Sequence, residues 1–159
     1  MGQQQLLLVI LVTIIVGIAT VVAINTFGTA ADQANIDAVR QDMLQISASA
    51  QQYYMRPEML GGGGRSWEGI TFNDFAFAAA GIDSDGETAQ NENGSYVISG
   101  ATAGAEFFVI TGHPANSSAY TPGSIDNDGL LTDPGTAAAD DQLEARVYPD
   151  RLEWPPYGN

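Results

Sequence analysis

The chain has 159 residues, with 5 Lys+Arg, 19 Asp+Glu, 1 His and no Cys, and its formal net charge is −14 at pH 7. The absence of cysteine excludes a disulfide scaffold, thiol catalysis and cysteine-ligated metal or iron–sulfur sites. The acidic excess argues against nucleic acid as a partner, because phosphate binding requires clustered Lys or Arg. The length is that of one domain, or of one domain with an appendage.

The first thirty-one residues carry no charged side chain, and Leu6 to Ile24 form an almost unbroken apolar run. As a helix this run is about 29 Å long, enough to cross a bilayer core of about 30 Å. We therefore assign residues 1–27 to an apolar helix that is transmembrane or otherwise fully buried. A cleaved secretory signal fits poorly, because the run is long and no Lys or Arg precedes Arg40. An ordinary anchor would carry flanking Lys or Arg; one explanation for their absence is a charged leader that preceded Met1 and was removed.

Residues 28–60 are predicted to continue this helix with a different surface. Apolar residues recur at alternating spacings of three and four, with polar residues between them. This pattern predicts that one helix face packs on a folded domain. The apolar face comprises Ile36, Val39, Met43, Ile46, Ala50 and Tyr53. The whole helix is expected to span about residues 3–56, because Pro57 disfavours helical backbone at Arg56 and four glycines follow at 61–64.

After a glycine-rich connection at residues 61–66, residues 67–159 have the composition of an acidic, β-rich globular head. Short apolar runs predict strands at Tyr96–Ser99, Glu106–Thr111 and Leu143–Tyr148, with a further candidate at Arg151–Trp154. Phe72 to Ala80 is ambiguous and is compatible with a short helix, and residues 112–142 are expected to form a long surface loop. The predicted fold class is α+β, with the second half of the long helix packed on a small antiparallel sheet.

A particular order of residues stands at the amino terminus: Gln5-Leu-Leu-Leu-Val-Ile-Leu-Val, then Ile14-Ile-Val-Gly-Ile-Ala, then Ala23-Ile-Asn-Thr-Phe27. This order resembles the type IV pilin and pseudopilin superfamily, in which a polar or acidic fifth residue precedes a Leu-Leu pair and an aliphatic run. The run then ends in a segment of small and aromatic residues. The resemblance covers residues 1 to about 55, and the head is similar to pilin heads only in general layout.

The resemblance implies a structural subunit, not an enzyme, that polymerises through its apolar helix into an extracellular filament at the cell surface. Its partners would be other copies of itself, membrane lipid before assembly, and the inner-membrane assembly machinery. The residues implied in assembly are Met1, Gln5, Leu6, Leu7, Val9, Ile10, Ile14, Gly17, Ile18 and Val21. Two alternatives are a minor pseudopilin of a secretion system and a membrane-anchored surface module that binds calcium.

Gln5 departs from the pilin pattern. Pilins normally carry Glu at the fifth mature position, where it is thought to meet the amino terminus of a neighbouring subunit. Gln5 can form hydrogen bonds but cannot form that ion pair. Leader peptidases of this family cut after glycine, and cleavage after Gly2 would instead place Leu7 fifth, where the polar pattern fits worse.

Few residues suggest chemistry. His113 is the single histidine and lies in Thr-Gly-His-Pro, which predicts a turn, so no hydrolase arrangement can be assembled around it. The glycines at 61–64 lack the lysine of a phosphate-binding loop and follow a helix rather than a strand. They are expected to form a flexible connection.

Two acidic turns have the D-x-D-G order that suits calcium, which takes six to eight oxygen ligands. Asp126 and Asp128, with Asp133 beyond, form the better candidate, and Asp83 and Asp85 form the other. The alternative is that both are ordinary solvated turns.

Two triplets match the glycosylation sequon, beginning at Asn93 and at Asn116. Ser117 and Ser118 are further candidates for carrying sugars. Such triplets also occur by chance.

Overall fold

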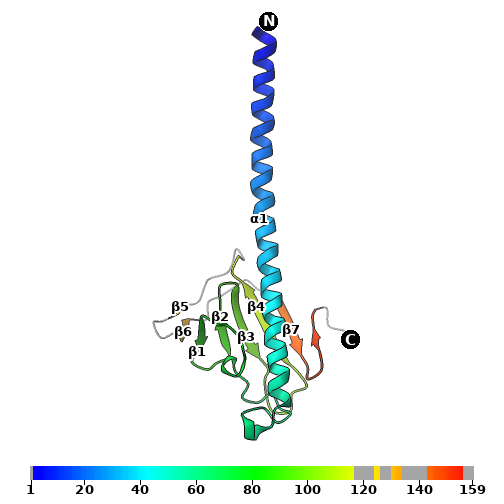
Figure 1. The fold of residues 1–159 in the computed structure, drawn as a ribbon, viewed down its shortest axis with the longest axis vertical. Helices are drawn as coiled ribbons and strands as arrows, with labels where there is room; N and C mark the ends of the chain where they lie inside the picture. The colour runs from blue at the N-terminus through cyan, green and yellow to red at the C-terminus, as the bar shows by residue number, and fades with distance from the viewer. Residues whose placement is uncertain (1, 117–123, 126–129, 134–142, 156–159) are drawn as a thin grey trace. The chain divides into compact units, whose positions relative to one another are not determined.

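The computed structural model describes residues 2–116, 124–125, 130–133 and 143–155. The chain divides into two compact units, residues 1–34 and residues 35–159, and we call the second the head unit. One helix, α1 (Gly2–Met55), contributes to both units (Figure 1). The predicted long helix is confirmed, with both ends within one residue of those expected.

The end of α1 is held by the glycine-rich segment that follows it. The amides of Gly63, Gly64 and Arg65 donate to the carbonyls of Tyr53, Arg56 and Tyr54 at 2.9, 3.0 and 2.9 Å. These bonds satisfy carbonyls that a helix end leaves without partners. An added Cβ at Gly63 would collide with the carbonyl of Ser66. The segment that we expected to be a flexible connection is therefore a hydrogen-bonded turn in which glycine is sterically required.

The head unit is built on an eight-stranded sheet in the order β5-β6-β1-β2-β3-β4-β7-β8. The strands are β1 (Gly81–Asp83), β2 (Thr88–Gln90), β3 (Gly94–Ser99), β4 (Phe108–Pro114), β5 (Ser124–Ile125), β6 (Leu130–Asp133), β7 (Leu143–Val147) and β8 (Leu152–Glu153). Neighbouring strands are antiparallel, as predicted, except that β1 and β6 are parallel. The α+β fold class is confirmed.

Several local predictions need correction. Two strands, β1 and β2, were missed, and residues 72–80 contain only a short 3-10 helix, η2 (Phe72–Asp74), closed by a capping box between Thr71 and Asp74. Residues 112–142 are not a single loop, because β4 runs through Pro114 and both β5 and β6 lie in this range. The predicted strands at 96–99, 143–148 and 151–154 are present with shifted ends.

The amphipathic half of α1 lies across one face of the sheet (Figure 1). Five of the six predicted apolar positions are buried, and Ile36 is half-buried. The sheet offers a close approach at Gly112, where an added Cβ would lie 2.8 Å from Val39 Cγ1 and 2.9 Å from Met43 Sδ. The shared core is formed by Val39, Met43, Ile46, Ala50, Tyr53, Trp67, Ile70, Phe72, Phe75, Ala89, Tyr96, Ile98, Phe108, Ile110, Ala145 and Val147.

One carboxylate on α1 fixes the helix to the β2–β3 hairpin. Oδ2 of Asp42 accepts hydrogen bonds from Tyr96 Oη at 2.6 Å, Asn91 Nδ2 at 2.8 Å and Asn93 Nδ2 at 2.8 Å. About two helical turns earlier, Asn35 Nδ2 donates to the carbonyl of Asn93 at 2.9 Å. Hydrogen bonds to a charged acceptor are the stronger kind, so this cluster fixes how α1 lies along the sheet.

Candidate functional site, an exposed apolar helix

Residues 2–34 present an apolar surface that is exposed in the described part of the chain. An 18-residue window of this helix has a mean hydropathy of 3.2, and none of it is buried. By length and composition it is the one helix in the described part of the chain that could cross a membrane. Its large side chains range from 46% exposed at Ile10 to 76% exposed at Phe27. This is far more apolar surface than a soluble monomer leaves in water.

The assembly residues predicted from the sequence lie on this helix, apart from Met1, which is outside the described residues. Leu6, Leu7, Val9, Ile10, Ile14, Ile18 and Val21 are exposed, as are Gln5 and Gly17. They do not form a single face, because apolar residues between them are equally exposed. The additional members are Leu8, Leu11, Val12, Ile15, Val16, Val22, Ile24 and Phe27. The unbroken hydropathy of the run already marked these residues, whereas spacing alone could not select a face.

The threonine hydroxyls within this surface are satisfied inside the helix. Thr13 Oγ1 donates to the carbonyls of Val9 and Ile10 at 3.0 and 2.8 Å. Thr20, Thr26 and Thr29 likewise donate to carbonyls three or four residues earlier. Threonine hydroxyls bonded in this way do not need water, so the helix can enter lipid or a dry bundle of helices without unpaired hydroxyl donors at these positions.

Gly17 adds a second property to this surface. Nothing lies within 4 Å of a Cβ built at this position, so the glycine is not required by contacts within the chain. Small residues allow helix backbones to approach one another closely in membranes. Gly17 therefore gives the helix a point of close approach for another helix.

The first acidic turn, at Asp83 and Asp85, joins β1 to β2. Asp83 Oδ1 accepts a hydrogen bond from the amide of Ser84 at 2.7 Å, and the Asp83 carbonyl accepts one from the amide of Gly86 at 2.9 Å. The carboxylate thus helps to form the turn itself. No group of three or more acidic or histidine side chains placed to hold a metal is found among the described residues.

Most of the second acidic turn lies outside the described residues. Asp126 and Asp128 lie outside the described residues, and Asp133 ends β6, where only the backbone is described. Calcium binding at this turn stays a prediction.

The two sequons differ in their surroundings. The amide nitrogen of Asn93, which a glycan would occupy, donates to Asp42 at 2.8 Å. Asn116 is exposed, and its backbone amide donates to Asn35 Oδ1 at 3.1 Å, which leaves its side chain at the surface. Ser117 and Ser118 lie outside the described residues. Of the two asparagines, Asn116 has the more accessible side-chain nitrogen.

His113 lies in strand β4 and not in a turn, so that prediction was wrong. It is paired with Ser95 of β3, and its Nδ1 is buried with no hydrogen-bond partner among the described residues. Burial lowers the pKa of His113 below its usual value of 6.5. Burial therefore favours the neutral form of this imidazole.

Comparison of the chain with known protein families, curated proteins and solved structures found no match. The functional argument therefore depends on the residues and geometry described above.

Proposed function

We propose that this chain is a structural subunit of an extracellular type IV pilus-like filament, which polymerises through the apolar half of α1. The observation that carries the proposal is the exposure of apolar side chains all around residues 6–27. Such a surface needs a continuous apolar environment on every side. Lipid supplies that environment before assembly, and a bundle of identical helices supplies it afterwards.

The energetics favour a bundle once the helix leaves lipid. Burying one large aliphatic side chain stabilises by about 1.5–3 kcal/mol, and the run contains many such side chains. Residues 2–34 are exposed in the described part of the chain, so this half of α1 is available to neighbours. Repeating one non-closing contact along an axis then yields a fibre rather than a closed ring.

The acidic composition is consistent with the head unit forming the outer surface. Thirteen acidic residues and no Lys or Arg occur between Ser66 and Ala145. A strongly charged surface keeps a particle soluble and opposes lateral association of neighbouring particles. Acidic heads around an apolar core would therefore keep single fibres apart.

Electron microscopy of material sheared from cells that produce the full chain tests this proposal, with mass spectrometry of the filaments. Thin helical fibres composed of this chain are expected, and the observed amino terminus distinguishes Met1 from Gln3 as the first residue. A chain that stays with the membrane pellet and is absent from every fibre would refute the proposal. That result would instead support a membrane-anchored monomer.

A further inference from the structure

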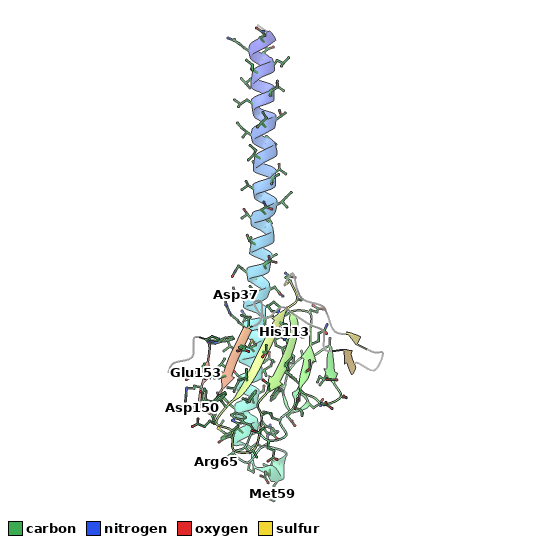
Figure 2. The ribbon with its side chains drawn as sticks, turned by 180° about the vertical axis from the view of Figure 1, so that it is seen from behind. Asp37, Met59, Arg65, His113, Asp150 and Glu153 are labelled. Carbon is green, nitrogen blue, oxygen red and sulfur yellow. The ribbon has the colours of Figure 1, made fainter. Side chains whose placement is uncertain are left out.

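The head unit carries an exposed apolar projection directly after α1. The 3-10 helix η1 (Glu58–Leu60) presents Met59, which is 96% exposed, and Leu60, which is 71% exposed. Met55, the last residue of α1, is also largely exposed beside them in sequence. Figure 2 shows Met59 at the extremity of the head unit, with its side chain directed away from the sheet. We call Met55, Glu58, Met59 and Leu60 the apolar knob.

The knob is held rigid by its backbone. The amides of Leu60 and Gly62 donate to the carbonyl of Pro57 at 2.9 and 3.2 Å, and the amide of Gly61 donates to the carbonyl of Glu58 at 2.9 Å. Pro57 fixes the entry to this turn with φ −60°. A preorganised projection loses little conformational entropy when it is bound. Met59 and Leu60 are thus exposed to solvent on a preorganised turn, which favours docking to another surface.

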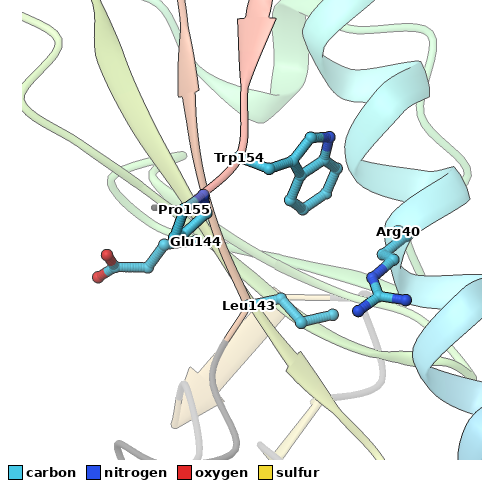
Figure 3. A pocket seen from close by; sticks show the side chains of 5 residues that line it. All are labelled: Arg40, Leu143, Glu144, Trp154 and Pro155. Carbon is cyan, nitrogen blue, oxygen red and sulfur yellow. The ribbon is translucent and has the colours of Figure 1, made fainter. Parts of the chain in front are cut away.

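The head unit also has a hollow at the edge of the sheet, whose lining is partly apolar and includes a cation. Its volume is about 400 Å³, and it is lined by Arg40, Leu143, Glu144, Trp154 and Pro155. Figure 3 shows the Trp154 ring, the Leu143 side chain and the Arg40 guanidinium directed into the same space, between α1 and strands β7 and β8. Leu143, Trp154 and Pro155 supply apolar walls, and Arg40 supplies a cation at one side. Glu144 also lines the hollow, but Figure 3 shows its carboxylate directed away from the space that the Trp154 ring and Arg40 face.

Arg40 can accept a further anionic partner. Its Nη1 contacts Asp37 Oδ1 at 3.2 Å, in a pair whose side chains are 49% and 64% exposed. Such exposed pairs contribute little, and a guanidinium has five N–H donors. A larger hollow of about 450 Å³ lies elsewhere on the head unit, but its lining already balances Arg65 and Arg151 with Glu106 and Asp150. The Arg40 hollow is therefore the better site for an apolar group that carries a negative charge.

We propose that the apolar knob of one copy docks in the Arg40 hollow of the next copy. Met59 would enter the space between Leu143, Trp154 and Pro155, where a thioether packs favourably against an aromatic ring. Glu58, adjacent to Met59, would pair with Arg40. The occupant is a second copy of this chain, because the same chain supplies both an exposed apolar group with an acidic neighbour and an apolar hollow with a basic one.

This contact would select an open polymer. The knob and the hollow are different patches, so their union is a head-to-tail contact, which builds an open polymer when successive copies are displaced along an axis and do not close into a ring. Between Arg40 and Met55 the helix rises about 22 Å at 1.5 Å per residue. A neighbour in the same orientation, displaced along the α1 axis by about this distance, would bring its knob level with the hollow. The inference rests on the proposed filament function and gives it a specific contact between heads.

Cysteine cross-linking of the full chain in cells tests the contact, because the chain has no cysteine of its own. A chain carrying both Met59→Cys and Leu143→Cys is expected to give a ladder of covalent multimers under mild oxidation. A mixture of the two single variants is expected to give dimers only. Met59→Cys with Ala103→Cys is the matched control, since Ala103 is exposed outside the hollow. Cross-linking no faster than in this control would overturn the inference.

Charge reversal provides a second readout. Arg40→Glu places a carboxylate opposite Glu58 and is expected to reduce cross-linking between Met59→Cys and Leu143→Cys by about tenfold or more. Glu58→Arg is expected to do the same, and the two reversals together are expected to restore it. Asp37→Asn, which alters only the existing partner of Arg40, is expected to leave cross-linking unchanged. Failure of the double reversal to restore it would contradict the pairing of Glu58 with Arg40.

The outcomes separate this inference from the proposed function. Wild-type filaments together with control-level cross-linking would leave the filament function standing and overturn the docking of the knob. A cross-linked ladder in membranes, without any filament at the cell surface, would support the docking and refute the filament function.

Discussion

Replacement of Asp42 by alanine is expected to be the most damaging single change at a polar position of α1. One oxygen of this carboxylate receives three hydrogen bonds, from Tyr96, Asn91 and Asn93. Tyr96 is fully buried, whereas the two asparagines are half-buried. The substitution removes the acceptor from all three donors at once and leaves α1 with fewer polar contacts to the hairpin.

The magnitude follows from which donors water can reach. A hydrogen bond to a charged group contributes about 1.5–3 kcal/mol, and the bond from buried Tyr96 should contribute in this range. The asparagine amides can exchange the carboxylate for water, so their bonds should add less than about 1 kcal/mol each. We expect Asp42→Ala to lower the free energy of unfolding of the head unit by about 2–4 kcal/mol.

The measurement is urea unfolding of the full chain in detergent micelles, followed by tryptophan fluorescence, because Trp67 is fully buried in the head core. Asp37→Ala is the matched control, since Asp37 is exposed on the same helix and, among the described residues, pairs only with the exposed Arg40. Asp37→Ala should lower the free energy of unfolding by less than about 0.5 kcal/mol. A double-mutant cycle with Tyr96→Phe isolates the shortest bond. Equal small losses for both aspartates, or no coupling in the cycle, would refute the reasoning.

Three further predictions concern the close approach, the histidine and the apolar helix. Gly112→Val should lower the free energy of unfolding by about 1–3 kcal/mol, measured by the same urea titration, because its side chain would overlap Val39 and Met43; an unchanged midpoint would contradict the close approach. The lowered pKa of His113 means that the unfolded chain binds a proton more readily than the folded chain, so stability is retained above pH 6.5 and falls as the pH drops through the folded pKa. Melting temperatures from about pH 7.5 to about pH 5 should fall more steeply for the wild type than for His113→Gln, and parallel curves would count against this. Val16→Asp should disfavour membrane insertion by about 2.5–3.5 kcal/mol and deplete the chain from carbonate-washed membranes, whereas Val16→Leu should not.

The long helix could be predicted because two independent signals in the sequence agree along its length. The apolar run from Leu6 to Ile24 requires helix wherever water is absent, since only helices satisfy their own backbone bonds there. The stripe from Val39 to Tyr53 has the helical period and faces the sheet core. Pro57 and the glycines then end the helix within one residue of the predicted position.

The short strands could not be predicted because their stability comes from pairing and not from their own residues. β1, at Gly81–Asp83, and β2, at Thr88–Gln90, have three residues each, too few to show an alternating pattern. β2 is held by its pairing with β3 and β1 by its pairing with β2. β6 pairs in parallel with β1 across a long separation in sequence, which no local signal reveals.

The glycine-rich segment was misjudged for a related reason. Four consecutive glycines in a sequence indicate conformational freedom, and the residues that remove that freedom lie before them in the chain. The carbonyls of Tyr53, Tyr54 and Arg56 at the end of α1 accept hydrogen bonds from this segment. Glycine is used here for close approach rather than for flexibility, and this ordered turn is what presents the apolar knob.

The apolar helix is exposed on all sides, so it cannot by itself determine the orientation and register of neighbouring subunits in a filament. Lipid tails are as apolar as leucine, so helices in a membrane gain little from the hydrophobic effect when they associate. A helix that is apolar all around also favours no single rotation about its axis. Under the proposed function, the helix therefore supplies the driving force once it leaves lipid, and the choice of neighbour and register must come from directional contacts. The knob and the Arg40 hollow are directional, place Glu58 and Arg40 beside apolar surfaces, and occupy separate places on one compact head unit. If the double charge reversal restores cross-linking, register in this filament is set by the heads; if cross-linking stays at the control level in intact filaments, the small residues of the helix, Gly17 first among them, must set it.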